Sequence, residues 1–208
     1  MKKFNHPDFQ TQLGKMIAEL EQSSQIEVVV LIKKSSALYE DVAIGIGAIV
    51  SILTFSYLFY VDTRFADYLA YLITLAAFGV GILLGLVSPP LQRLFTGKKR
   101  QERNVEIMAR ALFQKGGLHH TSTEVGTLIY VSLLEKMVYI LADRGAQLAI
   151  PEEEWQKIKT DLQSIFKEKQ QTEAFLQALE KCKTTFNHYI PALENNLNEL
   201  PNDLKIEL

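Results

Sequence analysis

The longest hydrophobic stretches of the chain are two runs between Val42 and Leu91, separated by a polar link from Asp62 to Asp67. The first run has no charged residue from Val42 to Val61, and the second has none from Tyr68 to Ser88. A bilayer core is crossed by about 20 apolar residues at a rise of about 1.5 Å each. The pattern therefore predicts transmembrane helices at 42–61 and 68–88. The alternative is a buried helical hairpin in a soluble protein.

Helical periodicity recurs outside these runs. Residues 8–21 and 105–114 each place hydrophobic side chains on one face, and Gly116-Gly117 should end the second of these helices. A third helix should begin at 151–154, where acidic residues suit a first turn. A fourth should be capped by Thr172 and end before Pro191.

Three short segments predict strands: 26–32, 127–132 and 137–142, the last two joined as a hairpin by residues 133–136. Their residues are apolar on both faces, so helices should cover both sides of the sheet. The expected fold is an α/β/α sandwich with a small mixed sheet. Because the first strand must pair across the hydrophobic hairpin, residues 1–34 and 100–191 should form one discontinuous domain, followed by an irregular tail at 192–208.

Charge and composition refine this picture. The net charge of −2 gives no reason to expect a nucleic-acid partner, and the single cysteine, Cys182, fits a reducing compartment. Residues 1–25 lack the apolar core of a signal peptide, so the first span is expected to target the protein. Basic residues flank the spans, whereas the link has a single basic residue, Arg64, beside two aspartates. The positive-inside rule then predicts a multi-pass membrane protein with both termini and the domain in the cytoplasm.

Two sets of residues suggest how the spans are held. Small residues four apart allow close helix packing, either within the hairpin or against a partner subunit; they are Ala43, Gly47, Ser51, Ala77, Gly81 and Gly85. Basic residues beyond the second span can contact anionic lipid headgroups, or simply lie on a solvated helix start; they are Arg93, Lys98, Lys99, Arg100 and Arg103. The spans carry no ionisable residue, which argues against an ion path.

Several motifs together resemble the TPM-domain family. They are the stretch from Gly126 to Gly145 (GTLIYVSLLEKMVYILADRG), Trp155 in EEEW, the NELP at 198–201, the strand IEVVV, the segment from Ser36 to Asp41, and Leu118-His119 with Thr121. The chain resembles in particular a bacterial membrane-protein branch with two spans inside the domain, and this resemblance implies a place in the bacterial inner membrane. The resemblance implies an α/β sandwich with a four-stranded sheet. It also implies a mixed range of roles: plant members are linked to photosystem II repair and phosphatase activity, some members bind calcium, and an animal member is a receptor auxiliary protein.

Candidate chemistry is sparse. Asp143 follows a strand and, with Glu124 or Glu135, has the oxygen ligands that calcium prefers; the alternative is a turn residue that accepts backbone hydrogen bonds. His119-His120 suits a surface loop better than a shared metal site. The lysines beside Cys182 could lower its pKa, although a structural thiol is the simpler reading. Hydrolase, phosphate-binding, HExxH and CxxC motifs do not occur.

These observations favour a non-catalytic accessory, assembly or stability factor, or small subunit, of a larger membrane protein complex. Its expected partners are the lipid bilayer and other membrane subunits, without a required cofactor. One alternative is a metal-dependent phosphatase at the membrane surface, and another is a homo-oligomeric membrane scaffold.

Overall fold

The computed structural model describes residues 4–61, 66–118, 124–192 and 205–207. Residues 205–207 are described by their backbone only. By its internal contacts the chain divides into two units. We call residues 1–36 with 102–208 the sheet unit, and residues 37–101 the hairpin unit. Each is described by itself.

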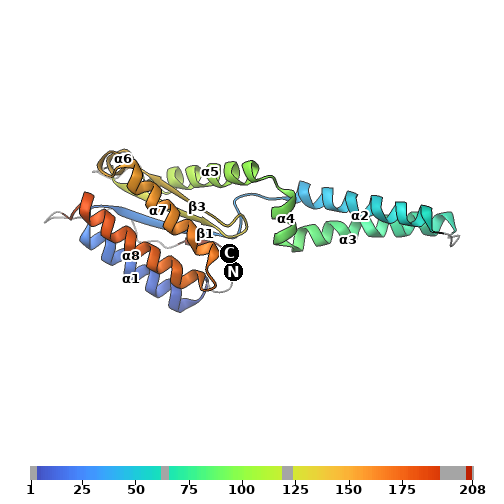
Figure 1. Ribbon diagram of the computed structural model, residues 1–208, viewed down its shortest axis with the longest axis horizontal. Coiled ribbons are helices and arrows are strands. Elements are labelled where there is room, and N and C mark those ends of the chain that lie inside the picture. Colours follow the sequence, from blue (N-terminus) through green and yellow to red (C-terminus); the bar gives the residue numbers. More distant parts are fainter. Residues whose placement is uncertain (1–3, 62–65, 119–123, 193–204, 208) are drawn as a thin grey trace. The chain divides into compact units, whose positions relative to one another are not determined.

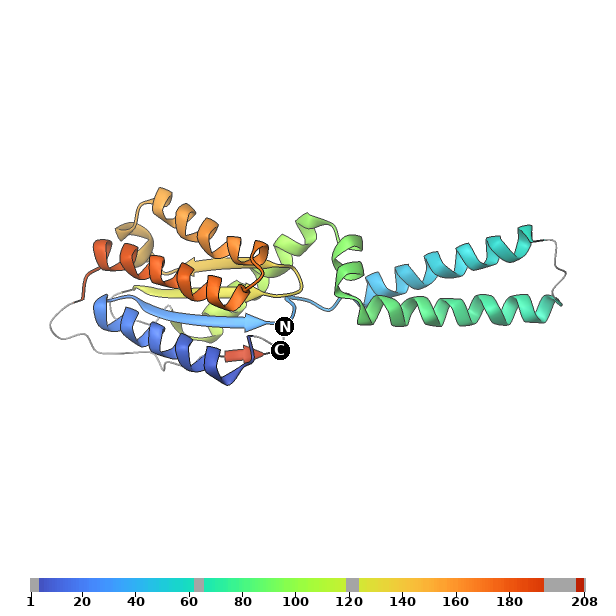
Figure 2. The same cartoon turned by 60° about the horizontal axis from the view of Figure 1, so that its bottom comes forward.

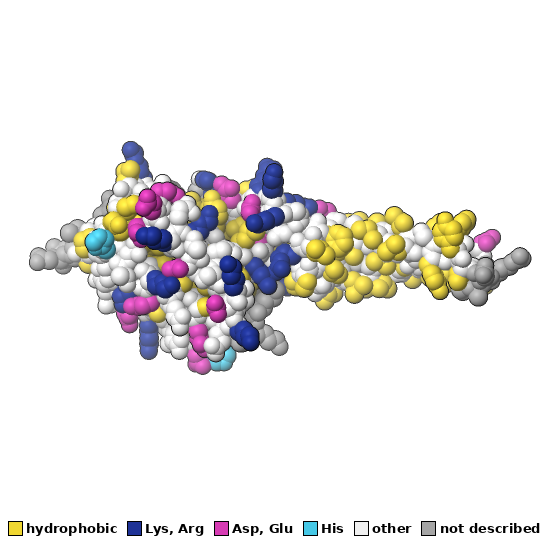
Figure 3. Space-filling view, viewed as in Figure 1, with side chains coloured by type: hydrophobic (Ala, Val, Ile, Leu, Met, Phe, Trp, Pro, Cys, Tyr) yellow, Lys and Arg dark blue, Asp and Glu magenta, His cyan; other side chains and the backbone are white. Residues whose placement is uncertain are grey.

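The hairpin unit contains two long apolar helices. Helix α2 spans Glu40–Tyr60 and α3 spans Asp67–Val87, and both are long and apolar enough to cross a membrane. Most of their large hydrophobic side chains are exposed, as Figure 3 shows along this unit. A core helix of a soluble protein would bury these side chains. The exposed apolar surface therefore favours lipid-facing helices over a buried hairpin.

The sheet unit is organised on a four-stranded sheet in the order β3-β2-β1-β4. Strand β1 (Glu27–Lys33) lies parallel to β2 (Gly126–Ser132), which pairs antiparallel with β3 (Met137–Ala142). The fourth strand, β4 (Lys205–Glu207), lies parallel to β1 on its other side. The sheet is thus mixed, as expected, and β1 is a central strand rather than an edge (Figure 2).

Helices cover both faces of this sheet (Figure 1). Helices α1 (Pro7–Ser23), α7 (Glu152–Ser164) and α8 (Gln171–Tyr189) bury their apolar faces against one side, around Val30, Ile129 and Phe175. Helix α5 (Lys98–Lys115) packs Val105 and Ala109 against Leu128 and Tyr130 on the other side. The side chains of each strand alternate between these two cores, which explains why the strands are apolar at almost every position. The α/β sandwich is confirmed.

The structure corrects two local expectations and adds two short helices. The tail is not irregular throughout, because 205–207 form β4 on the otherwise unpaired edge of β1, whose backbone groups favour another strand. Thr172 does not cap α8, whose N-cap is Gln170. The short helix α4 (Pro89–Phe95) begins at Pro89, since proline suits a first turn. Asp143 is the N-cap of the other short helix, α6 (Arg144–Ala149).

Candidate functional site

The small residues of the two apolar helices meet at the α2–α3 contact. A Cβ added to Gly81 would lie 2.7 Å from the Cα of Gly47, and one added to Gly85 would lie 2.7 Å from the Cα of Ala43. The Ser51 hydroxyl donates to the Thr74 carbonyl across the same contact, at 3.2 Å. Ala77 is half-buried. These small residues therefore allow the hairpin to pack on itself at backbone distance.

Two other glycines of the same helices face away from this contact. Gly45 on α2 and Gly79 on α3 are exposed, and a Cβ added at either would meet no atom within 4 Å. Each stands two residues from an interface glycine, so it lies on a different side of its helix. The hairpin thus has small-residue positions that its own packing leaves open.

Polar side chains form hydrogen bonds at the start of α2 and at the end of α3. The Arg100 guanidinium donates to both carboxylate oxygens of Asp41, at 2.6 and 3.0 Å, and lies 5.7 Å from the ring centre of Tyr39. The Gln92 side-chain amide donates to the carbonyls of Gly85 and Leu86 at the end of α3. These bonds satisfy backbone and charged groups beside the apolar helices, where unpaired polar groups are costly.

The five basic residues predicted to contact headgroups fall into different environments. Lys98, Lys99 and Arg103 are exposed on α5, and Arg93 is half-buried on α4. Arg100 differs because its guanidinium is bound bidentately by Asp41. Arg100 therefore has a partner within the protein, and the headgroup role of the other four stays a prediction.

A buried polar network lies where the chain leaves β1. The carboxylate of Glu135, in the β2–β3 turn, accepts the backbone N–H of Ser36 at 3.0 Å and the hydroxyl proton of Ser132. The Ser36 hydroxyl in turn bonds the hydroxyls of Ser132, at 3.0 Å, and Tyr130, at 2.9 Å. All four side chains are at most 5% exposed. The network fixes the last residue before the hairpin unit to the end of the sheet.

The predicted calcium ligands do not form one site. Asp143 uses one carboxylate oxygen to accept the Arg144 N–H at 2.8 Å, as the N-cap of α6; its second carboxylate oxygen is buried without a hydrogen-bond partner. The side chain of Glu124 is exposed, and its carbonyl accepts the N–H groups at the start of α6. Glu135 lies at the opposite end of β2, about 20 Å away at the rise of a strand. Glu135 therefore does not share a metal ion with Asp143, and a calcium site of Asp143 with Glu124 stays a prediction.

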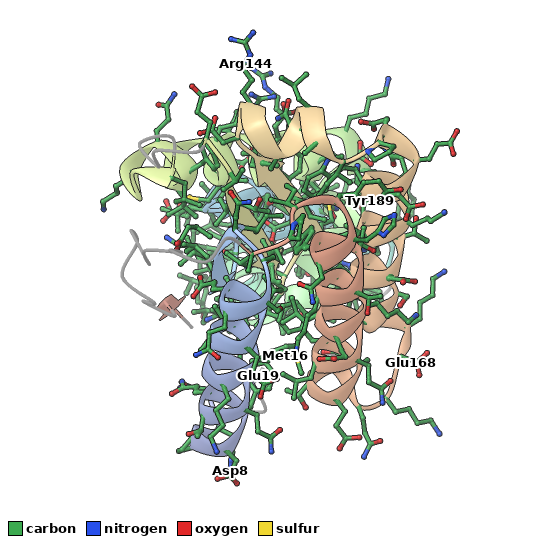
Figure 4. The ribbon with its side chains drawn as sticks, turned by 90° about the vertical axis from the view of Figure 1, so that its left-hand side faces the viewer. Asp8, Met16, Glu19, Arg144, Glu168 and Tyr189 are labelled. Carbon is green, nitrogen blue, oxygen red and sulfur yellow. The ribbon has the colours of Figure 1, made fainter. Side chains whose placement is uncertain are left out.

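The remaining sequence candidates have structural surroundings. Burial, and to a lesser degree Asp161, raises the pKa of the Cys182 thiol to about 12, so the neighbouring lysines do not activate it. His119 and His120 lie outside the described residues. Among the residues described, there is no group of three or more His, Cys, Asp or Glu side chains that could hold a metal ion. Arg144, at the start of α6, extends its side chain away from the fold (Figure 4).

Two glutamine side chains form hydrogen bonds with the backbone of β3, a strand at the edge of the sheet. The Asp143 N–H, directly after β3, donates to the Gly126 carbonyl of β2. Because residues along an antiparallel pair alternate between bonding the partner strand and facing away from it, the backbone groups of Val138, Ile140 and Ala142 face away from β2. Gln163 on α7 accepts the Val138 N–H, and Gln147 on α6 donates to the Ala142 carbonyl. A groove of about 350 Å³ lies beside β3 and is lined in part by Ile140, Gln147 and Trp155. The glutamines reduce the tendency of this edge to pair with another strand.

Polar residues of these contacts were not identifiable from the sequence. Their only signal in the sequence is the family resemblance, which includes Ser36 and Asp41 in the segment 36–41 and Tyr130, Ser132 and Glu135 in the stretch 126–145. Asp41 and Arg100 lie 59 positions apart in the chain. Their roles depend on strand pairing and on the return of the hairpin, which bring distant residues together.

Comparisons with known proteins agree with this architecture. Residues 93–185 match the model of the TPM domain family. Among solved structures, the chain is similar to the NMR structure of the BA42 protein from the psychrophilic bacterium Bizionia argentinensis sp. nov., with a TM-score of 0.59 at 16% identity, covering 97% of this chain and 94% of that one. No curated protein matches the chain in sequence. At this identity the structural likeness indicates a shared fold only.

Proposed function

We propose that the chain, of which residues 93–185 match the model of the TPM domain, is a membrane-anchored, non-catalytic accessory protein. It stabilises, or helps to assemble, a larger complex of membrane proteins. In this proposal α2 and α3 cross the bacterial inner membrane, and the sheet unit lies on the cytoplasmic side because basic residues flank the spans.

The observation that carries the proposal is the position of the hairpin within the domain. Strands β1 and β2 pair along their whole length, from Glu27 with Gly126 to Lys33 with Ser132, yet the entire hairpin unit lies between them in sequence. The domain is therefore joined to the apolar helices by two covalent connections. Such an arrangement supports a domain that works at the membrane surface rather than one on a long flexible tether.

The surface of the hairpin supports an accessory role. Its helices are apolar, and they pack on each other through Gly47, Gly81 and Gly85, while Gly45 and Gly79 remain open on their outer sides. Open small residues allow a second protein's helix to approach closely. The sequence of both spans lacks the charged residues of an ion path.

Native mass spectrometry of the full chain, purified in mild detergent, tests this proposal. The wild-type protein should retain another membrane protein at fixed stoichiometry. Gly45→Leu and Gly79→Leu should weaken that complex, since each adds bulk to an outer face without touching the α2–α3 contact. Ile52→Leu, a near-isosteric change on the exposed face of α2, is the matched control. A lone monomer would refute the proposal, whereas self-association without another protein would favour the homo-oligomeric scaffold.

One observation favours a second candidate, a phosphatase. Asp143 has a buried carboxylate oxygen without a hydrogen-bond partner, in a domain whose family relatives include phosphatases. Phosphate release from p-nitrophenyl phosphate by the full chain, with and without calcium or magnesium, tests it. Asp143→Asn should abolish any turnover, while Asp161→Asn, a partly exposed carboxylate of α7 beside Lys181, should not. Absence of turnover in the wild-type protein eliminates this candidate.

A further inference from the structure

Helix α4 has an apolar face that its own unit does not cover. Leu91, Leu94 and Phe95 lie at helical spacing and share that face. Leu94 is 76% exposed and Phe95 is 49% exposed. Leu38, in the segment that enters α2, is 79% exposed as well. Large apolar side chains rarely gather in exposed positions unless they meet another apolar phase.

The position of α4 along the chain indicates which phase this is. Only Ser88 separates the end of α3 from the start of α4. Since α3 alone is long enough to cross the hydrocarbon core, α4 begins where the headgroup layer begins. A short helix with an exposed apolar face at this depth suits an orientation in the plane of the interface.

The polar groups around α4 are already arranged for this layer. Gln92 covers the last carbonyls of α3, and the Gln101 side-chain amide donates to the carbonyls of Arg93, at 2.8 Å, and Thr96, at 2.6 Å. Four backbone carbonyls at these helix ends are thus paired where the chain would enter a partly dehydrated region. Beside them, Lys98 and Lys99 are exposed, and Arg100 is bound by Asp41.

We propose that these residues form an interfacial collar that seats in the headgroup layer of a bilayer containing anionic phospholipid; the collar consists of Leu38, Arg93, Leu94, Phe95, Lys98 and Lys99. The apolar members enter the acyl boundary, and the basic members bind lipid phosphates. The collar sets the depth of the hairpin and prefers anionic lipid. It rests on the part of the proposed function in which α2 and α3 cross the membrane.

Depth-dependent fluorescence quenching tests the apolar half. Trp155 is the only tryptophan, and its indole N–H has no hydrogen-bond partner, so Trp155→Phe gives a suitable background. In that background, Phe95→Trp and Ile52→Trp are placed in vesicles of equal parts phosphatidylcholine and phosphatidylglycerol. Lipids brominated near the glycerol backbone should quench the Phe95→Trp variant most strongly, and lipids brominated deep in the acyl chain should quench the Ile52→Trp variant most strongly.

The outcomes separate this inference from the proposed function. Quenching of the Ile52→Trp variant without quenching of the Phe95→Trp variant overturns the collar and leaves the membrane anchor intact. Failure to quench either variant overturns both. If Trp155→Phe does not fold, a nitroxide on Leu94→Cys gives the same depth by its relative collision rates with oxygen and a nickel chelate. Cys182 does not interfere, because it is 1% exposed and its pKa is raised.

Lipid preference tests the basic half. Native mass spectrometry in mixed micelles measures how tightly the full chain retains phosphatidylglycerol relative to phosphatidylcholine. The double variant Lys98→Gln/Lys99→Gln should reduce that preference by about fivefold per lysine at low salt. Lys167→Gln/Lys169→Gln removes the same charge from exposed positions of the sheet unit and should have no effect. An equal effect of both pairs, or none of either, overturns the electrostatic role.

Discussion

Arg100 holds Asp41 with both of its terminal nitrogens, at 2.6 and 3.0 Å, although the two residues lie 59 positions apart, with all of α3 between them. Asp41 lies in the first turn of α2 and Arg100 in the first turn of α5. The pair therefore joins the two points at which the chain enters and leaves the hairpin. A bidentate guanidinium contact fixes direction as well as distance, which lysine cannot do.

Removal of this pair should loosen the start of α2. We expect Arg100→Gln to increase amide hydrogen exchange severalfold at 42–46, with little change in the middle of the helix, because the pair is partly exposed and acts locally. Hydrogen–deuterium exchange of the full chain in detergent measures this. Lys99→Gln is the control, since it removes the neighbouring charge without touching Asp41. Equal exchange in the two variants would show that the pair does not hold the helix.

The glycines of the α2–α3 contact should tolerate no side chain. Gly81→Ala would place a methyl group 2.7 Å from the Cα of Gly47, so the helices must separate, at a cost of about 1–3 kcal/mol. Gly79→Ala, on the same helix, meets no atom within 4 Å and should leave stability unchanged. Unfolding in mixed micelles of rising dodecyl sulfate content measures both. The prediction fails if the two alanine variants unfold together.

Much of the fold could be predicted because it depends on local patterns. The expected strand 137–142 coincides with β3. The expected spans differ from α2 and α3 by one or two residues at each end. Apolar periodicity and uncharged length are properties of neighbouring residues, and they survive in the folded chain. The helices on both sides of the sheet followed from the same reasoning, since its strands are apolar on both faces.

The parts that could not be predicted depend on distant residues. Strand β4 forms only because β1 leaves an edge for it, and a three-residue segment has no periodicity of its own. Helix α6 follows from the Asp143 cap, which resembles a turn until the next residues are seen to be helical. Glu135 was assigned to a metal on the basis of its charge, but the β2–β3 turn directs it to Ser36, 99 residues earlier.

The network around Glu135 should contribute strongly to stability. Glu135→Ala leaves the buried Ser36 N–H and the Ser132 hydroxyl without their acceptor, so we expect a loss of about 2–4 kcal/mol. Glu135→Gln should cost less, because its amide can accept from Ser36 and donate to Ser132. Thermal unfolding followed by Trp155 fluorescence compares them. Glu153→Ala, an exposed carboxylate in the first turn of α7, is the control, and equal loss in all three variants would contradict this role.

Glu21 should make the sheet unit less stable at alkaline pH. Its side chain is 8% exposed in the last turns of α1 and accepts the Val28 N–H at 3.2 Å. Burial, with a smaller effect of the nearby Glu27 charge, raises the pKa of Glu21 to about 7. Because the folded-state pKa is above the unfolded value, the stabilisation is complete below about pH 4.5 and is lost as the pH rises through 7.

The full chain should therefore lose on the order of 2–3 kcal/mol of stability between about pH 5 and pH 8 through this one group. Glu21→Gln keeps an acceptor for Val28 and cannot ionise, so it should flatten the pH profile and exceed the wild-type stability at the alkaline end. Glu19→Gln, on the exposed side of the same helix beside Lys183, should leave the profile unchanged. Thermal unfolding across this pH range measures the pH dependence of stability in each variant. If stability falls with pH as steeply in Glu21→Gln as in the wild-type protein, other groups cause the pH dependence.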